Sequence, residues 1–395
     1  DDGNSAVSLP EAPLLGVLPG TGGLTRLVDK RKVRRDIADF FSTLVEGVRG
    51  KRAVEWRFVD AVYARSRFDE AVSQRAADLA ASSDRPSSGP GVTLGPLELT
   101  RSEDRFEYST VTVEMNRMKR TADLTVRGPD GPQPSDAQAM LALGDQYWPL
   151  RAFRELDAAL LHLRLNEPEI GVVVLKTVGD REAVLAIDRT LATHRDHWLV
   201  REILHFMKRT LKRLDLTAKS FVALIEPGSC FAGTLLELAL AADQSFMLDD
   251  PDRPTAIGVS VLNGGALPMS TGLTRLQTRF LGEPDKVEKL LAIGEAIEAP
   301  VALQTGLVSF TPDELDWEDE VRLMLEGRAS LSPDALTGLE ANLRFAGPET
   351  LETKIFGRLS AWQNWIFQRP NAVGERGALK TYGVEGRPEF DWRRT

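Results

Sequence analysis

The sequence predicts an α/β fold in which strands and helices alternate, and two pairs of segments carry that prediction. Apolar runs at 170–176 and 220–226 are typical of strands that are buried on both faces. Each run follows a stretch with apolar residues at helical spacing, at 148–169 and at 197–214. Strands that alternate with crossover helices pair in parallel and form a layered domain. A further strand is predicted at 105–117, where polar and apolar residues alternate, and helices dominate from about residue 285 onward.

Length and composition narrow the class of protein. A chain of 395 residues exceeds the size at which one hydrophobic core stops growing, so two domains are expected. The net charge of −9 and the scattered basic residues argue against nucleic acid as a partner. The apolar runs are too short for a membrane span. Cys230 is the single cysteine, which suits a reducing compartment, and we expect a cytoplasmic protein.

An internal repeat organises the chain. The decapeptide at 18–27, LPGTGGLTRL, matches LPMSTGLTRL at 267–276 in seven of ten positions, at a spacing of 249 residues. The same spacing aligns 45–59 with 294–308 without a gap. A recurrent turn before a helix explains the first match alone, whereas a duplicated domain explains both.

The two copies differ in what precedes the repeated decapeptide. More than a hundred residues precede it in the second copy, but only seventeen do in the first, so we expect the first copy to lack its N-terminal part. The segment 80–96 is rich in Ser, Pro and Gly, as linkers are. We therefore predict a remnant of the first copy at 1–79, a linker at 80–100 and the second copy at 101–395.

Three motifs resemble the crotonase, or enoyl-CoA hydratase/isomerase, superfamily. They are the strand region NEPEIGVVVLKTVGD, the strand, turn and helix of SFVALIEPGSCFAGTLLELALAAD, and the two Gly/Pro loops of the repeat. The resemblance implies a crotonase-like (ClpP/crotonase) α/β fold in tandem copies, the first one truncated. It also implies an acyl-CoA substrate, no separate cofactor, no metal and a homodimer.

The tail at 362–383, WQNWIFQRPNAVGERGALKTYG, is similar to one branch of that superfamily. Members of this branch cleave the ring of 2,3-epoxybenzoyl-CoA with two waters during aerobic benzoate breakdown, giving 3,4-dehydroadipyl-CoA semialdehyde and formate. The resemblance implies the same reaction for the complete protein. Because the first copy is expected to be incomplete, the chain by itself is expected to be inactive.

Glu237 is the first candidate for the chemistry. A helix N-terminus presents unpaired N–H groups that can hold the oxyanion of a thioester. By the resemblance, Ala232, Gly233 and Thr234 form part of that oxyanion hole, and Glu237 stands where many members carry an acid/base glutamate. The pair Thr234 and Glu237 also has the spacing of a capping box, and a helix cap is the interpretation that we favour for Glu237. The second donor of the hole is in doubt, because 177–188 lacks the small-residue turn of the superfamily.

Glu11 is the second candidate, and the one that we favour as general acid/base. It stands about where the superfamily carries its second catalytic glutamate, with one extra residue before Pro19. The spacing of 249 carries Glu11 onto Ser260, so the second copy has lost this acid. The partner of Glu11 is expected upstream of Asp1.

Two alternatives stay open. The chain could be an enoyl-CoA hydratase or isomerase that uses Glu237, or the second copy could be a structural or dimerisation module that binds no acyl-CoA. His194, His197 and His205 lack a zinc-binding pattern and are interpreted as structural or solvated. Cys230 is interpreted as a buried small residue rather than a reactive thiol.

Overall fold

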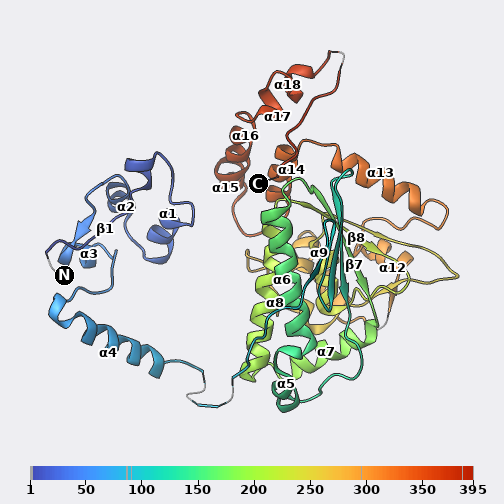
Figure 1. Ribbon diagram of the computed structural model, residues 1–395, viewed down its shortest axis with the longest axis horizontal. Coiled ribbons are helices and arrows are strands. Elements are labelled where there is room, and N and C mark those ends of the chain that lie inside the picture. Colours follow the sequence, from blue (N-terminus) through green and yellow to red (C-terminus); the bar gives the residue numbers. More distant parts are fainter. Residues whose placement is uncertain (1–2, 86–87, 90, 295, 385, 395) are drawn as a thin grey trace. The chain divides into compact units, whose positions relative to one another are not determined.

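The computed structural model describes residues 3–85, 88–89, 91–294, 296–384 and 386–394 (Figure 1). The chain divides into two compact units, Asp1–Gly89 and Pro90–Thr395. The division falls within 80–100, the segment whose composition predicts a linker. That the first unit is a remnant of a crotonase-like domain stays a prediction.

The first unit is mostly helical and has a small core. Its elements are β1 (Ala6–Val7), η1 (Glu11–Leu15), α1 (Gly23–Thr25), η2 (Arg26–Lys30), α2 (Arg35–Ser42), β2 (Val48–Arg49), α3 (Gly50–Glu55), η3 (Arg65–Arg67) and α4 (Phe68–Ala81). Strands β1 and β2 pair in antiparallel fashion. The buried core consists of Leu27, Val33, Ala38, Phe41, Val48 and Ala53. Helix α4 buries none of its residues.

A seven-stranded sheet forms the centre of the second unit. Its strands, in spatial order, are β3 (Thr100–Arg101), β4 (Arg105–Glu107), β5 (Val111–Asn116), β6 (Thr121–Arg127), β7 (Val172–Val178), β8 (Ser220–Ile225) and β9 (Gln244–Met247). The first four strands pair in antiparallel fashion, and β6 to β9 pair in parallel. The parallel pairing of β7 and β8 confirms the expected α/β order. The predicted strand at 105–117 is interrupted, because 108–110 turns between β4 and β5.

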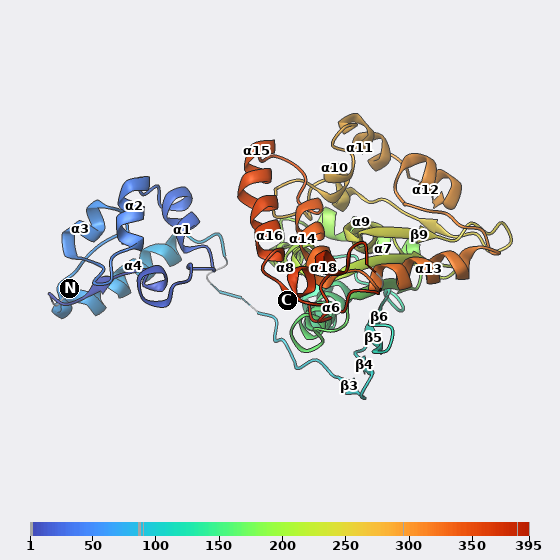
Figure 2. The ribbon, with the colours of Figure 1, turned by 90° about the horizontal axis from the view of Figure 1, so that it is seen from above.

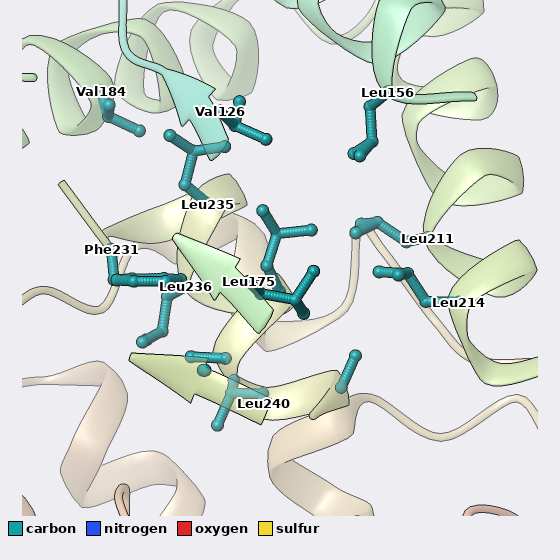
Figure 3. Packing of buried hydrophobic residues seen from close by; sticks show 14 of the residues in the cluster. Val126, Leu156, Leu175, Val184, Leu211, Leu214, Phe231, Leu235, Leu236 and Leu240 are labelled. Carbon is teal, nitrogen blue, oxygen red and sulfur yellow. The ribbon is translucent and has the colours of Figure 1, made fainter. Parts of the chain in front are cut away.

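Alternation along β7 explains why its first four residues, 172–175, are all apolar. Val172 and Val174 face one layer, where they pack with Val321 of α13 (Trp317–Ala329). Val173 and Leu175 face the opposite layer and its larger core. Figure 3 shows Leu175 there among side chains from α6 (Trp148–Asn166), α8 (Trp198–Leu216) and α9 (Gly233–Ala241). A strand segment that is covered on both faces needs an apolar residue at every position, as 172–175 has.

The remaining elements of the second unit surround the sheet or lie in the C-terminal region, and most of them are short. Helices α10 and α11 lie next to each other (Figure 2). In chain order these elements are α5 (Ala137–Leu143), η4 (Gly144–Gln146), α7 (Arg181–Thr193), β10 (Ala256–Ile257), η5 (Val261–Gly264), α10 (Arg275–Arg279), α11 (Pro284–Leu291), β11 (Ile297–Glu298), α12 (Ala299–Thr305), α14 (Pro333–Leu343), α15 (Leu351–Lys354), η6 (Ile355–Leu359), α16 (Ser360–Ile366), α17 (Pro370–Val373) and α18 (Ala378–Thr381).

The internal repeat reappears in the structure element by element. Helices α2 and α11 begin and end 249 residues apart, as do η2 and α10, and β2 and β11. The chain leaves α3 and α12 in the same way: Phe58 N–H donates to Ala53 O, and Leu307 N–H donates to Ala302 O. Such agreement in local hydrogen bonding supports a duplicated domain rather than a chance resemblance of two loops.

None of the helices among the described residues combines the length and the apolar character that crossing a lipid bilayer requires.

Candidate functional site

The predicted oxyanion site lies at the amino end of α9. Strand β8 leads into a turn in which Ser229 N–H donates to Glu226 O, and Cys230 N–H then donates to Thr177 Oγ1 at 2.9 Å. Helix α9 begins at Gly233, with Ala232 as its N-cap residue. Ala232, Gly233 and Thr234 therefore occupy the helix N-terminus, as the sequence predicts, and all three are buried.

The N–H groups of these three residues already have acceptors within the protein. Ala232 N–H donates to Cys230 O at 2.8 Å, and Gly233 N–H donates to Gly258 O at 2.9 Å. Thr234 N–H donates to Oδ2 of Asp188 at 2.8 Å. A substrate oxyanion would have to displace these acceptors, so the helix N-terminus is closed in this arrangement.

Asp188, a residue of α7, closes the N-terminus of α9 with its carboxylate. Its Oδ2 also accepts a hydrogen bond of 2.6 Å from Ser260 Oγ, while Oδ1 has no hydrogen-bond partner among the described residues. The side chain is fully buried, and burial raises the pKa of Asp188 to about 7. The carboxylate thus occupies the place at a helix N-terminus where an anion is favoured.

Gly233 makes this approach possible. A Cβ atom at residue 233 would lie 1.9 Å from Asp188 Oδ2, and the backbone there has a φ of +48°. Both conditions exclude a side chain, because L-residues with a Cβ rarely adopt that φ and no atom tolerates such a contact. The position of the Asp188 carboxylate therefore requires a glycine at residue 233.

Glu237 is buried in an ion-pair network rather than exposed to a pocket. Its Oε1 accepts from Asn263 Nδ2 at 2.7 Å, and its Oε2 accepts from Arg275 at 2.9 Å. Arg275 also donates to Asp215 at 2.8 Å, and each of the three ionic side chains is at most 2% exposed. This network joins α8, α9 and α10, so Glu237 acts as a structural link in the second unit.

The predicted capping box of Thr234 and Glu237 does not form. Helix α9 starts at Gly233, which makes Glu237 the fifth residue of the helix, and its N-cap Ala232 offers no side-chain acceptor. The helix-cap interpretation of Glu237 is therefore wrong. Capping boxes occur instead at Ser260 with Asn263 and at Thr274 with Gln277.

Glu11 begins η1 in the first unit and is partly exposed. Its Oε2 is shielded from solvent and has no hydrogen-bond partner in the described part of the chain. Strand pairing shifts the counterpart of Glu11 by one residue. Ala6 pairs with Arg49 as Ala256 pairs with Glu298, so the spacing between the two copies is 250 rather than 249 before the repeated decapeptide. Glu11 therefore corresponds to Val261 and not to Ser260. The π-helical turn η1 holds the extra residue. In either register the second unit has no acid there.

The remaining candidates have ordinary surroundings. His194 Nε2 lies 3.0 Å from Ser135 O, and His205 Nδ1 lies 3.1 Å from Lys208 Nζ. Across the described residues, no three His, Cys, Asp or Glu side chains gather as a metal site requires. Cys230 is fully buried, and burial raises its pKa to about 11, so its thiol is not activated.

Asp188 and Arg275 were not identified from the sequence, although each left a signal. Asp188 shares the apolar side of α7 with Val184, Ile187 and Leu191, at helical spacing. A carboxylate among core positions must have a specific partner. Arg275 belongs to the repeated LTRL, where its counterpart is Arg26.

Comparisons with known proteins place the chain in a family. It is 53% identical over all 395 residues to a benzoyl-CoA-dihydrodiol lyase of Aromatoleum evansii, and it covers 71% of that protein. No protein-family model matches the chain. A solved enoyl-CoA hydratase from Geobacillus kaustophilus HTA426 aligns with a TM-score of 0.52 at 18% identity, over 75% of this chain and 100% of that one. This structural likeness confirms the expected crotonase-like fold.

Proposed function

The chain belongs to the benzoyl-CoA-dihydrodiol lyase family, and from that membership we propose that it forms part of a lyase that cleaves the ring of an aromatic-derived acyl-CoA. The observation that carries the proposal is the identity of 53% over an alignment that covers all 395 residues of the chain. The substrate that we propose is 2,3-epoxybenzoyl-CoA, and the products are 3,4-dehydroadipyl-CoA semialdehyde and formate.

This reaction balances with two waters alone. One carbon leaves as formate, the six others remain in the semialdehyde thioester, and no electron acceptor is consumed. A water must be positioned and deprotonated, and the charge that develops on the thioester oxygen must be held by N–H groups. We therefore propose that the protein needs no metal and no organic cofactor besides the CoA of its substrate. A cytoplasmic homodimer is the state that we propose for it.

We assign the acid/base role to Glu11 rather than to Glu237. The closed end of α9 supports this assignment, because Asp188 takes the Thr234 N–H and the oxygens of Glu237 are held by Asn263 and Arg275. The same closure supports a structural role for the second unit. It disfavours the alternative of an enoyl-CoA hydratase or isomerase that uses Glu237.

The test measures formate release from 2,3-epoxybenzoyl-CoA by the chain fused to the part of the Aromatoleum relative that it does not span. Glu11→Gln should lower kcat by about a hundredfold or more, as is usual when a general acid/base is removed. Glu46→Gln, an exposed glutamate of the same unit, is the control and should keep full activity.

Two results would contradict the assignment. If Glu11→Gln released formate at the unchanged rate, Glu11 would have no catalytic role. Hydration of crotonyl-CoA that Glu237→Gln abolishes, without loss of folded protein, would establish the hydratase alternative.

A further inference from the structure

Corresponding residues of the two units differ sharply in exposure. Leu18 is 69% exposed in the first unit, whereas its counterpart Leu267 is 1% exposed. Arg26 is exposed and its Nε lies 3.4 Å from Thr21 O, whereas its counterpart Arg275 is buried between Glu237 and Asp215. The first unit thus displays to solvent what the second unit uses for internal packing.

Helices α4 and α13 show the same contrast, and both begin at the corresponding position of the repeat. Val321 of α13 is 9% exposed because it packs on β7 and β8, with Trp317 beside it. Its counterpart Val72 in α4 is 50% exposed, and Phe68, the counterpart of Trp317, is also exposed. Apolar side chains in a row on an exposed helix mark a surface that another element covers.

In the second unit one continuous segment of the chain covers both Val321 and Arg275. Residues 172–247 supply the strands β7 to β9 under α13 and the helices α8 and α9 around Arg275. A surface complementary to the first unit therefore needs a parallel sheet on one side. On the other side it needs two buried carboxylates on neighbouring helices.

We propose that the first unit docks, through Leu18, Arg26, Phe68 and Val72, onto a second crotonase-type α/β core. The source to which we commit is a polypeptide homologous to the part of the Aromatoleum relative that the chain does not span. That part amounts to about 160 residues, which is enough for a core of the size that precedes β10 in the second unit. In the complex Arg26 forms a buried ion pair with two carboxylates, as Arg275 does.

The experiment uses the full 395-residue chain and the unmatched part of the relative, produced as a separate polypeptide. Isothermal titration calorimetry should show a complex of one to one, and light scattering should give the summed mass. Val72→Asp places a charge against the apolar face of the sheet, and Arg26→Gln leaves two buried carboxylates without a counter-charge. Each variant should weaken binding more than tenfold.

Two matched controls separate docking from general effects. Gln74→Asp adds the same charge on α4, but its counterpart Leu323 faces solvent, and Arg49→Gln removes a positive charge whose counterpart Glu298 is exposed. Both controls should bind as the unaltered chain does. Because Arg26 and Val72 are exposed in the first unit, their variants should keep its circular dichroism spectrum.

Three outcomes would overturn the proposal. The first is no complex at 100 µM of each polypeptide. The second is binding that Val72→Asp and Arg26→Gln leave unchanged. The third is a homodimer of the chain alone that Val72→Asp dissociates, because this face would then bind a second copy. None of these measurements needs a substrate, so their result is independent of the proposed lyase activity.

Discussion

Asp188 is fully buried, and one of its oxygens has no hydrogen-bond partner in the part of the chain that the structure describes. It therefore keeps its proton to a higher pH than an exposed aspartic acid does. Burial raises the pKa of Asp188 to about 7, whereas in the unfolded chain it is near 4. Between these values the folded chain binds a proton that the unfolded chain has released. The contribution of Asp188 to stability is therefore complete below pH 4 and is lost as the pH rises to about 7.

Asp188→Asn should remove this pH dependence, because the amide keeps an acceptor for Thr234 N–H and Ser260 Oγ but does not titrate. The free energy of unfolding of the unaltered chain, relative to that of the variant, should fall by about 2 to 4 kcal/mol between pH 4.5 and 7.5. Urea unfolding at several pH values measures it. Asp196→Asn, in an exposed turn, should leave the curve of the unaltered chain in place. If the stability curves of Asp188→Asn and of the unaltered chain ran parallel between pH 4.5 and 7.5, the buried group would be charged over that whole range, against this prediction.

The sequence predicts where the N-terminus of α9 lies, but not whether its N–H groups are free to bind a ligand. Ala232, Gly233 and Thr234 were placed at a helix N-terminus from the turn before them and the apolar run after them, and they lie there. Whether the N–H groups of Gly233 and Thr234 are free depends on Gly258 and Asp188, which are distant from them in the chain. Local spacing also suggested a cap for Glu237, yet the start of α9 at Gly233 moved that residue out of reach.

At the scale of elements, Arg275 ties α10 to α8 and α9 through Asp215 and Glu237. Arg275→Met should cost about 3 to 5 kcal/mol of stability, because it leaves two buried carboxylates without their partner. Restoring neutrality with Asp215→Asn and Glu237→Gln in the same chain should recover part of that loss. Chemical denaturation measures the free energy of unfolding of the unaltered chain, of Arg275→Met and of the triple variant. Arg322→Met, at an exposed helical ion pair, is the control and should cost less than about 1 kcal/mol.

Helices α4 and α13, which begin at corresponding positions of the repeat, allow the effect of the same substitution on stability to be compared. Val321→Ala should destabilise the second unit by about 1 to 2.5 kcal/mol, because it leaves a cavity between α13 and β7. Val72→Ala should change the stability of the first unit by less than about 0.5 kcal/mol, because α4 buries nothing there and alanine favours helices. Hydrogen exchange in each helix reports the two effects separately. An equal loss in both helices would mean that α4 is already packed.

Element order was predictable because hydrophobic period is a local property of the sequence, and the repeat is visible when the chain is compared with itself. The strands β7 and β8 and the helices α6 and α8 followed from patterns within a few dozen residues, and the spacing of 249 followed from the match between two distant decapeptides. The break at 108–110 and the π-helical turn η1 did not follow. Each depends on strand pairing or on one inserted residue, which hydrophobic periodicity does not record.

At the scale of the whole molecule, the two units differ in the size of their cores. The first has six buried apolar residues in its cluster, whereas the second buries a cluster that extends over the sheet and its helices. Small cores are marginally stable, so calorimetry should show two transitions, the first unit melting at the lower temperature. The proposed partner polypeptide should raise only the lower transition. A single transition in the chain alone would mean that the units unfold as one.

The tethering of Asp188 also bears on how many ligands the protein can hold. A carboxylate carried by the chain itself competes at a fixed and very high effective concentration, whereas a free thioester competes at the concentration of the solution. No attainable amount of an acyl-CoA analogue should displace it from α9. We therefore predict that the chain fused to the unmatched part of the Aromatoleum relative titrates with one equivalent of analogue per chain rather than two, on the proposal that the first unit belongs to a second crotonase-type domain.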